Sequence, residues 1–398
     1  MINQSWLDKQ LQIIVQRQEE ISNKVIKVIV KRINEVGELK PSDIHTLRQL
    51  YRSGADVREI NRLIAIGTAM QVQDIKHIIQ ITARDLYEDA KPFYDYRKKP
   101  FIPYKDNKNL QRIVNAIAKQ TNNSFMNLSN SKATGFVLSD GTKTVFMDMK
   151  NAYQKIIDEA VQTLAFGINN YKALIRKSVK QLTASGVQGI HWESGYHQRL
   201  DTAIRRNILD AIRQMSIAVD EQIGKEIGAD GVEISAHPLS APDHEPIQGH
   251  CFTKENFNKL QNGNDFEDIY HNKFSGIARP IGEWNCRHIT ASVVIATYKP
   301  LYSLKELEEF KQANRDGYTT SKGKHYTLYE CTQVQRRMET DIRRLKDEWL
   351  AFKELDDKDS MSILEGKISQ KVAEYKLFSK ECNIQAFREN LSVSGYKK

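Results

Sequence analysis

The helical periodicity of this chain stops between Val232 and His288. On either side, apolar residues recur at the three- and four-residue steps of an α-helix, whereas this segment is polar and punctuated by glycine and proline. The segment holds five of the ten histidines and two of the four cysteines, and the candidate site residues among them are His237, His244, His250, His288, Cys251 and Cys286. The chain therefore cannot be one uninterrupted helical array, and a specialised site is expected in the irregular segment.

The predicted fold class is α+β and mostly helical. A chain of 398 residues is too long for one compact core, and a composition of 40% hydrophobic and 27% charged residues excludes wholesale disorder. We expect a helical N-terminal region, a mainly helical middle, a small α+β motif domain with short strands and long C-terminal helices, over residues 1–92, 93–230, 231–300 and 301–398.

Local patterns predict the elements inside these regions. Separate helices are expected near 43–53, 56–66 and 72–90. Alternating residues around Asp140-Gly141 predict a hairpin near 134–147, and the β-branched stretch 289–298 predicts a strand. Apolar residues at alternating three- and four-residue steps predict a coiled-coil-like helix over 328–357, packed on another helix of this chain or of a neighbouring subunit.

Aromatic and basic residues interleave between residues 93 and 119, where prolines at 92, 100 and 103 predict extended backbone. The net charge of +9 permits contact with a polyanion without establishing it. The segment suits a protein-docking arm or a linker better than a single-stranded nucleic-acid site, which stays the second interpretation. The candidate contact residues are Arg97, Lys98, Lys99, Tyr104, Lys105 and Lys108.

Histidine and cysteine side chains of the irregular segment are all competent zinc ligands. Their spacing matches no familiar ligand pattern, however, because His237 and His244 lie seven apart in a proline-rich loop and Cys286-x-His288 stands alone. We therefore expect no cofactor, with structural zinc as the less favoured alternative. The favoured interpretation is that these histidines satisfy buried backbone groups and fix loops to one another.

A catalytic interpretation is also open. Two of the histidines, with Glu245, Glu283 and Arg287, offer the acid, base and oxyanion partner that phosphodiester cleavage needs. Nothing in the sequence shows that these groups converge, and the chain contains neither a glycine-rich phosphate loop nor a Gly-x-Ser-x-Gly elbow. We expect a protein that is not an enzyme.

The sequence also bears on the compartment. Residues 1–30 lack the features of a secretory signal, and no apolar run is long enough to span a bilayer. The four scattered cysteines form neither a Cys-x-x-Cys pair nor a disulfide framework. We expect assembly in a reducing cytoplasm and no membrane partner.

Several motifs in order resemble the phage minor capsid protein 2 family of tailed bacteriophages and prophages. They are Glu233-Ile-Ser-Ala-His-Pro, Asp243-His244, Gln248-Gly249, Gly282-Glu-Trp-Asn-Cys-Arg-His and the stretch from Tyr326 to Glu339. The loop after His237 departs from the family pattern: Leu239-Ser-Ala-Pro-Asp-His lacks the usual arginine, and Ile247 stands in place of a tryptophan.

The resemblance implies a structural virion protein, located in the capsid near the portal and acting in head morphogenesis or DNA packaging. It implies the portal, the major capsid protein or both as partners, and a place beside the packaged DNA. The apolar seam of the C-terminal helix separately leaves a homo-oligomer through that helix open. A nuclease-like effector and an internal DNA-contacting protein stay open as alternatives. The expected fold-locking residues are His237, His244, Gln248, Gly249, Trp284, Asn285, Cys286, Arg287 and His288.

Overall fold

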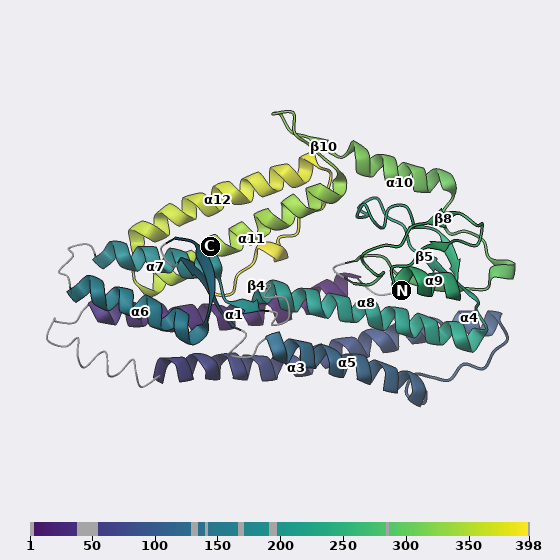
Figure 1. Cartoon of the computed structure of the whole chain (residues 1–398), viewed down its shortest axis with the longest axis horizontal. Coiled ribbons are helices and arrows are strands. Elements are labelled where there is room, and N and C mark those ends of the chain that lie inside the picture. Colours follow the sequence, from purple (N-terminus) through teal and green to yellow (C-terminus); the bar gives the residue numbers. More distant parts are fainter. Residues whose placement is uncertain are drawn as a thin grey trace.

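Long helices lie side by side along the molecule, and a small α+β domain sits at one end of them (Figure 1). The computed structural model describes residues 4–37, 55–128, 134–139, 142–165, 171–190, 197–283 and 286–396. Helices make up most of these residues and the sheets are small and antiparallel, which confirms the α+β, mostly helical prediction.

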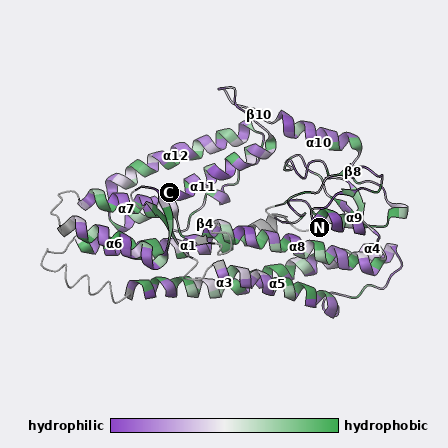
Figure 2. Ribbon diagram, in the orientation of Figure 1, coloured by the Kyte–Doolittle hydropathy of each residue, from purple (hydrophilic) through white to green (hydrophobic). Residues whose placement is uncertain are grey.

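The helical body is built on four helices: α1 (Gln4–Gly37), α3 (Ala55–Glu88), α5 (Lys108–Leu128) and α8 (Leu200–Ile227). Helix α3 contacts the other three, and α8 contacts α1 and α5 as well. Green and purple residues alternate along these helices in Figure 2, as expected where one face of a helix packs into a core and the other meets water. Their buried faces belong to one continuous hydrophobic core.

Helix α3 corrects the prediction of two helices over 56–66 and 72–90. No proline interrupts the intervening residues, and Ile60, Ile64 and Ile75 stay on the buried face across the join. Gly67 lies at this join because a Cβ there would overlap Ile21 of α1. The glycine therefore permits the close approach of two helices and does not end one. The helix expected over 43–53 lies outside the described residues.

A second layer covers one end of the body. It contains α6 (Met149–Ala165), α7 (Tyr171–Ser185) and a sheet of order β2-β1-β3-β4. Strands β1 (Thr134–Ser139) and β2 (Thr144–Asp148) form an antiparallel hairpin where the alternating sequence predicts one. The expected Asp140-Gly141 turn lies outside the described residues. Short strands β3 (Gln188–Ile190) and β4 (His197–Arg199) lead the chain into α8.

The small domain has a sheet of order β6-β5-β9, from β5 (Gly231–Ile234), β6 (Cys251–Thr253) and β9 (Thr290–Val293). Helix α9 (Lys254–Gln261) and the hairpin β7 (Phe266–Glu267) and β8 (Lys273–Phe274) complete it around a separate hydrophobic core. The strand expected over 289–298 is shorter than predicted. After Val293 the chain turns into the 3-10 helix η2 (Ile295–Thr297), because Asp230 accepts a hydrogen bond from the Ile295 N–H (2.8 Å).

The C-terminal part consists of α10 (Leu304–Asp316), the hairpin β10 (Tyr318–Thr319) and β11 (His325–Tyr326), and the antiparallel helices α11 (Leu328–Glu354) and α12 (Lys358–Glu381), followed by the short η3 (Glu389–Leu391). Thr327 and Glu330 form a capping box that fixes the start of α11. Cys331, Ile342 and Phe352 of the expected seam are buried, and α11 contacts α12, α1 and α7. The seam is therefore covered within this chain.

The segment after α3 corrects the prediction of extended backbone. Residues 91–96 form helix α4 (Lys91–Tyr96), with Pro92 in its first turn, where the missing N–H of proline does no harm. Tyr94 and Phe101 pack edge to face (ring centroids 5.1 Å apart), and Phe101 stacks on Tyr87 of α3 (5.2 Å). Most aromatic rings of this segment thus belong to the core.

No helix in the described part of the chain combines the length and apolarity that crossing a bilayer requires.

A buried charge cluster joins α1, α8, α11 and β4. The Arg199 guanidinium lies 3.3 Å from Asp201 and 3.1 Å from Asp347, and Arg343 lies 3.2 Å from Glu19. Three carboxyl groups thus face two guanidinium groups. Burial raises the pKa of Glu19 to about 8 against the opposing effect of Arg343, and burial also raises the pKa of Asp347. Glu19 therefore holds a proton at neutral pH and the cluster is electrically neutral.

This proton makes the stability of the protein depend on pH. The folded state binds it below about pH 8, whereas the unfolded chain releases it above the ordinary value of 4.5, so the contribution is complete below 4.5 and is lost as pH rises to about 8. The free energy of unfolding of the Glu19→Gln variant should therefore fall by a few kcal/mol less than that of the wild type over this pH range. Urea denaturation at about pH 5 and about pH 9 measures it.

Glu20→Gln, on the exposed face of the same turn, is the matched control and should keep the wild-type pH dependence. An unchanged slope in Glu19→Gln would contradict the assignment of the proton.

Candidate functional site

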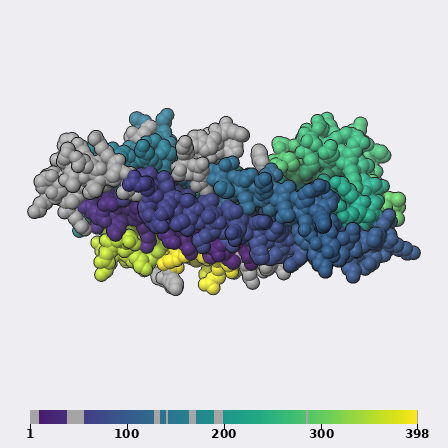
Figure 3. Space-filling model, turned by 90° about the horizontal axis from the view of Figure 1, so that it is seen from below, coloured from purple at the N-terminus to yellow at the C-terminus, as the bar shows by residue number. Residues whose placement is uncertain are grey.

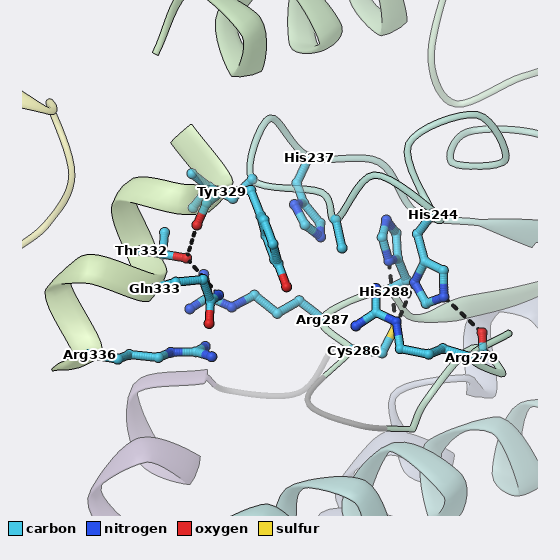
Figure 4. Close-up of a pocket in the computed structure, with 12 residues that line it drawn as sticks. His237, His244, Arg279, Cys286, Arg287, His288, Tyr329, Thr332, Gln333 and Arg336 are labelled. Carbon is cyan, nitrogen blue, oxygen red and sulfur yellow. Dashed lines mark hydrogen bonds between the residues drawn. The ribbon is translucent and has the colours of Figure 1, made fainter. Parts of the chain in front are cut away.

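A polar cavity of about 90 Å³ lies where the small domain meets the first turns of α11 (Figure 4). The small domain provides one wall, which includes His237, His244, Arg279, Cys286, Arg287 and His288. Helix α11 provides the other wall, with Tyr329, Thr332, Gln333 and Arg336. Two parts of the chain that are remote in sequence therefore build one site.

The β5–β9 ladder explains why His237 and His288 meet. Ile234 is paired with Thr290, and the ladder continues through the Ser235 N–H, which donates to the Ile289 carbonyl (2.9 Å). His237 follows one strand and His288 precedes the other, so their rings stack with centroids 4.5 Å apart. An antiparallel register thus places side chains about fifty residues apart in contact.

Gln248 and Gly249 close the loop that carries His244. The Gln248 Oε1 accepts from the His237 backbone N–H (3.0 Å) and lies 3.4 Å from His288 Nε2. Gly249 has a φ of +73°, a left-handed conformation that favours glycine, and a Cβ at this position would overlap Leu307 of α10. The two residues therefore fix the loop against the sheet and against α10.

Three buried side chains converge at the bottom of the cavity. The Cys286 Sγ lies 3.5 Å from His244 Nδ1 and 3.5 Å from His288 Nδ1, and Figure 4 shows both rings directed at this sulfur. The exposed fractions are 1% for His244, 7% for Cys286 and 2% for His288. This is the one group of potential metal ligands among the described residues.

The hydrogen bonds fix which ring nitrogens carry protons. The His244 Nε2 lies 2.9 Å from the Arg279 carbonyl oxygen, which can only accept. The Gln248 Oε1, an amide oxygen that can only accept, lies 3.4 Å from His288 Nε2, and the Ser240 hydroxyl, 3.5 Å from the same nitrogen, donates to the Ala241 carbonyl, so His288 Nε2 is assigned as the donor. Both Nε2 atoms are therefore donors, and in the neutral rings both Nδ1 atoms present a lone pair to Cys286.

Burial keeps these imidazoles neutral. It lowers the pKa of His288 to about 2, with the neighbouring His237 and His244 adding to the effect, and it lowers the pKa of His237 to about 4, with Arg287 adding to the effect. Burial likewise lowers the pKa of His244 and raises that of the Cys286 thiol. At neutral pH the cluster is thus two uncharged rings and one S–H proton.

Three arginines, Arg279, Arg287 and Arg336, line the cavity, and Asp243 balances the charge of Arg279. Arg279 forms a bidentate ion pair with Asp243, which also orients the Arg279 carbonyl toward His244. Burial, and then the charge of Arg287, lower the pKa of Arg336. Figure 4 shows Arg287 extending from the loop toward α11, where Arg336 lies.

The structure brings together most of the expected fold-locking residues: His237, His244, Gln248, Gly249, Cys286, Arg287 and His288. Trp284 and Asn285 lie outside the described residues. The carboxyl groups of the alternative, catalytic interpretation are engaged elsewhere, because Glu245 accepts from Asn314 of α10 (3.0 Å) and Glu283 from Gln214 of α8 (3.4 Å). His250 pairs with Asp268 (2.7 Å), outside the cavity.

Sequence reasoning missed Arg279, Tyr329, Gln333 and Arg336. The capping box Thr327-x-x-Glu330 marks the start of α11 in the sequence. No local signal says that this helix start lies over the histidine loop, because that contact depends on the tertiary fold.

The candidate contact residues of the basic segment lie apart from the cavity. Lys98, Lys99, Lys105 and Lys108 are exposed, whereas Arg97 is half-buried and its Nε donates to the Ile227 carbonyl (3.4 Å). Tyr104 packs against the core. In Figure 3, α3 and α5 (blue) run along the underside toward the end that carries the small domain (green).

A comparison with known families gives the assignment. The family model described as Phage minor capsid protein 2 matches residues 2–378. The chain belongs to the phage minor capsid protein 2 family. No curated protein and no solved structure matches it. The match confirms the resemblance in the motifs, and it makes this chain a member of a family of phage capsid components.

In this minor capsid protein, Gly249→Ala should loosen the histidine loop. The substitution adds left-handed strain of about 1–2 kcal/mol and an overlap with Leu307 that costs about 1–3 kcal/mol more. Hydrogen exchange of residues 235–250 measures the effect, and exchange there should be faster.

Gly228→Ala is the control, because Gly228 has a similar φ of +75° and open space around its Cβ position. It should leave exchange of the loop unchanged. Equal effects of the two variants would show that Leu307 does not hold the loop.

Proposed function

We propose that this protein is a non-enzymatic component of the phage head that acts at the portal vertex through protein–protein contacts. One observation supports this most: the cavity has a volume of about 90 Å³, whereas pockets for small-molecule ligands measure roughly 300–1,000 Å³. A nucleotide does not fit in it, and Glu245 and Glu283 are bonded elsewhere. The histidine cluster therefore serves the fold.

The docking surface we propose is the turn around α4. Phe93, Tyr96 and Ile102 expose 61%, 80% and 49% of their surface, and Lys98 and Lys99 are exposed beside them. Aromatic residues are enriched at the centres of protein interfaces, and lysines such as these suit the polar rim. A portal or major capsid protein with an acidic rim suits this surface. A homo-oligomer through the C-terminal helices would have to use the outer faces of α11 and α12, because the seam is covered within this chain.

The docking proposal predicts that Tyr96→Ala weakens capture of the portal protein of the same phage by at least about tenfold, as for an interface hot spot. Binding to the purified portal and mass spectrometry of purified virions measure it. Met126→Ala, an apolar residue of α5 that is 54% exposed, is the control and should bind as the wild type does. Wild-type virions without this chain would refute the proposal.

An internal DNA-contacting protein is the second candidate, because Lys98, Lys99, Lys105 and Lys108 are exposed along one segment. DNA affinity that falls steeply with salt and is reduced in the Lys105→Ala variant would favour it.

The nuclease alternative predicts turnover that depends on the histidine cluster. We expect no cleavage of DNA or RNA by the wild-type chain, with or without added divalent metal. Cleavage that is present in the wild type and lost in His288→Ala would overturn the non-enzymatic proposal.

A further inference from the structure

The His244, Cys286 and His288 cluster has more lone pairs than protons. Both Nδ1 atoms face the Cys286 sulfur at 3.5 Å, yet the thiol has one proton and can donate to one ring at a time. The other buried Nδ1 is left without a donor. Leaving a buried polar atom unsatisfied costs about 1–3 kcal/mol, so a cation between the three atoms would relieve the arrangement.

The two sulfur–nitrogen spacings are those of a tetrahedral metal centre. With Zn–S of about 2.3 Å, Zn–N of about 2.05 Å and a tetrahedral angle, sulfur and nitrogen ligands lie about 3.5–3.6 Å apart. Both sulfur–nitrogen distances here are 3.5 Å, and all three candidate atoms lie within 4.8 Å of one another. The three atoms can therefore bind one ion with little movement.

The hydrogen bonds of the two Nε2 atoms are of the kind that orient histidine ligands around metal sites. The His244 Nε2 donates to the Arg279 carbonyl and the His288 Nε2 donates to the Gln248 oxygen, which leaves each Nδ1 as the ligand atom. The Asp243 carboxylate lies 3.8 Å from the same His244 Nε2 and is itself paired with Arg279. The ligand tautomers are thus already set.

We propose that His244 Nδ1, Cys286 Sγ and His288 Nδ1 bind one zinc ion whose fourth position opens on the cavity. Binding forms one Zn–S and two Zn–N bonds and releases the Cys286 thiol proton to water. The ion joins the loop after β5 to the segment before β9, so metal binding is coupled to the fold of these residues.

Zinc suits this ligand set better than other common metals. One thiolate and two imidazoles are zinc ligands, whereas magnesium and calcium require oxygen ligands. Copper prefers a similar set with a long axial methionine, and no methionine lines this cavity. The cavity of about 90 Å³ has room for a water molecule, and Arg287 and Arg336 favour an anion such as hydroxide or chloride at the open position.

Metal analysis of the full chain tests the site. The purified protein is loaded with zinc, freed of excess by gel filtration and analysed for zinc, copper and iron. We expect about one zinc per chain in the wild type and nearly none in Cys286→Ala and His288→Ala. Cys251→Ala, a second buried cysteine of the same domain, is the matched control and should retain the metal.

Cobalt substitution in the wild type makes the test independent of variants that fail to fold. A cobalt-loaded chain should show the near-ultraviolet thiolate-to-cobalt absorption band, and a chelator should abolish the band and lower the melting temperature. The proposal is overturned if the loaded wild type contains no stoichiometric zinc, or if it prefers copper or iron. It is overturned equally if Cys286→Ala and His288→Ala keep the zinc. Portal binding is not part of this experiment, so its outcome is separate from that of the proposed function.

Discussion

Three carboxyl groups on helix α8 hold the architecture together. Asp201 pairs with Arg199 of β4, Asp220 accepts hydrogen bonds from Ser292 of β9 (2.9 Å), and Glu226 accepts from the Tyr94 hydroxyl (2.5 Å) and from Tyr87 of α3. A carboxyl group that is buried, as Asp201 is, or partly buried, as Asp220 and Glu226 are, is costly unless it has partners, so each position favours the groups that pack beside it. These carboxyl groups of α8 therefore help to position β4, β9, α4 and α3 beside it, in addition to the packing of the apolar core.

Helix α8 positions both walls of the cavity. Ser292 anchors β9 to α8, and β9 begins two residues after His288. The opposite wall, α11, is tied to the same body through Arg343, which lies near Asp201 (3.7 Å) as well as Glu19. Both walls are thus tied to helix α8, and the histidine cluster lies between them.

The sequence predicts the features that depend on local patterns. Long apolar periodicity gave the helices, the alternation around Asp140-Gly141 gave the hairpin, and the loss of periodicity after Val232 marked the small domain. The prediction from sequence was wrong at two places. Gly67 lies inside α3, where it permits the close approach of α1, and Pro92 lies in the first turn of a helix instead of keeping the backbone extended. The site was predicted in part. Its residues were visible as motifs, but the meeting of His244 with Cys286, 42 residues later, depends on the β5–β9 register and on the loop closed by Gly249.

The central claim is that this chain is an architectural part of the phage particle and that its histidine cluster braces a fixed shape. A cryo-electron microscopy map of the particle neck at side-chain resolution tests it most directly. The account predicts density for this chain beside the portal, with the small domain seated on α8 and His237, His244 and His288 enclosed against α11. A particle that lacks the chain, or a small domain detached from α11 with its imidazoles facing a nucleic-acid strand, would contradict it.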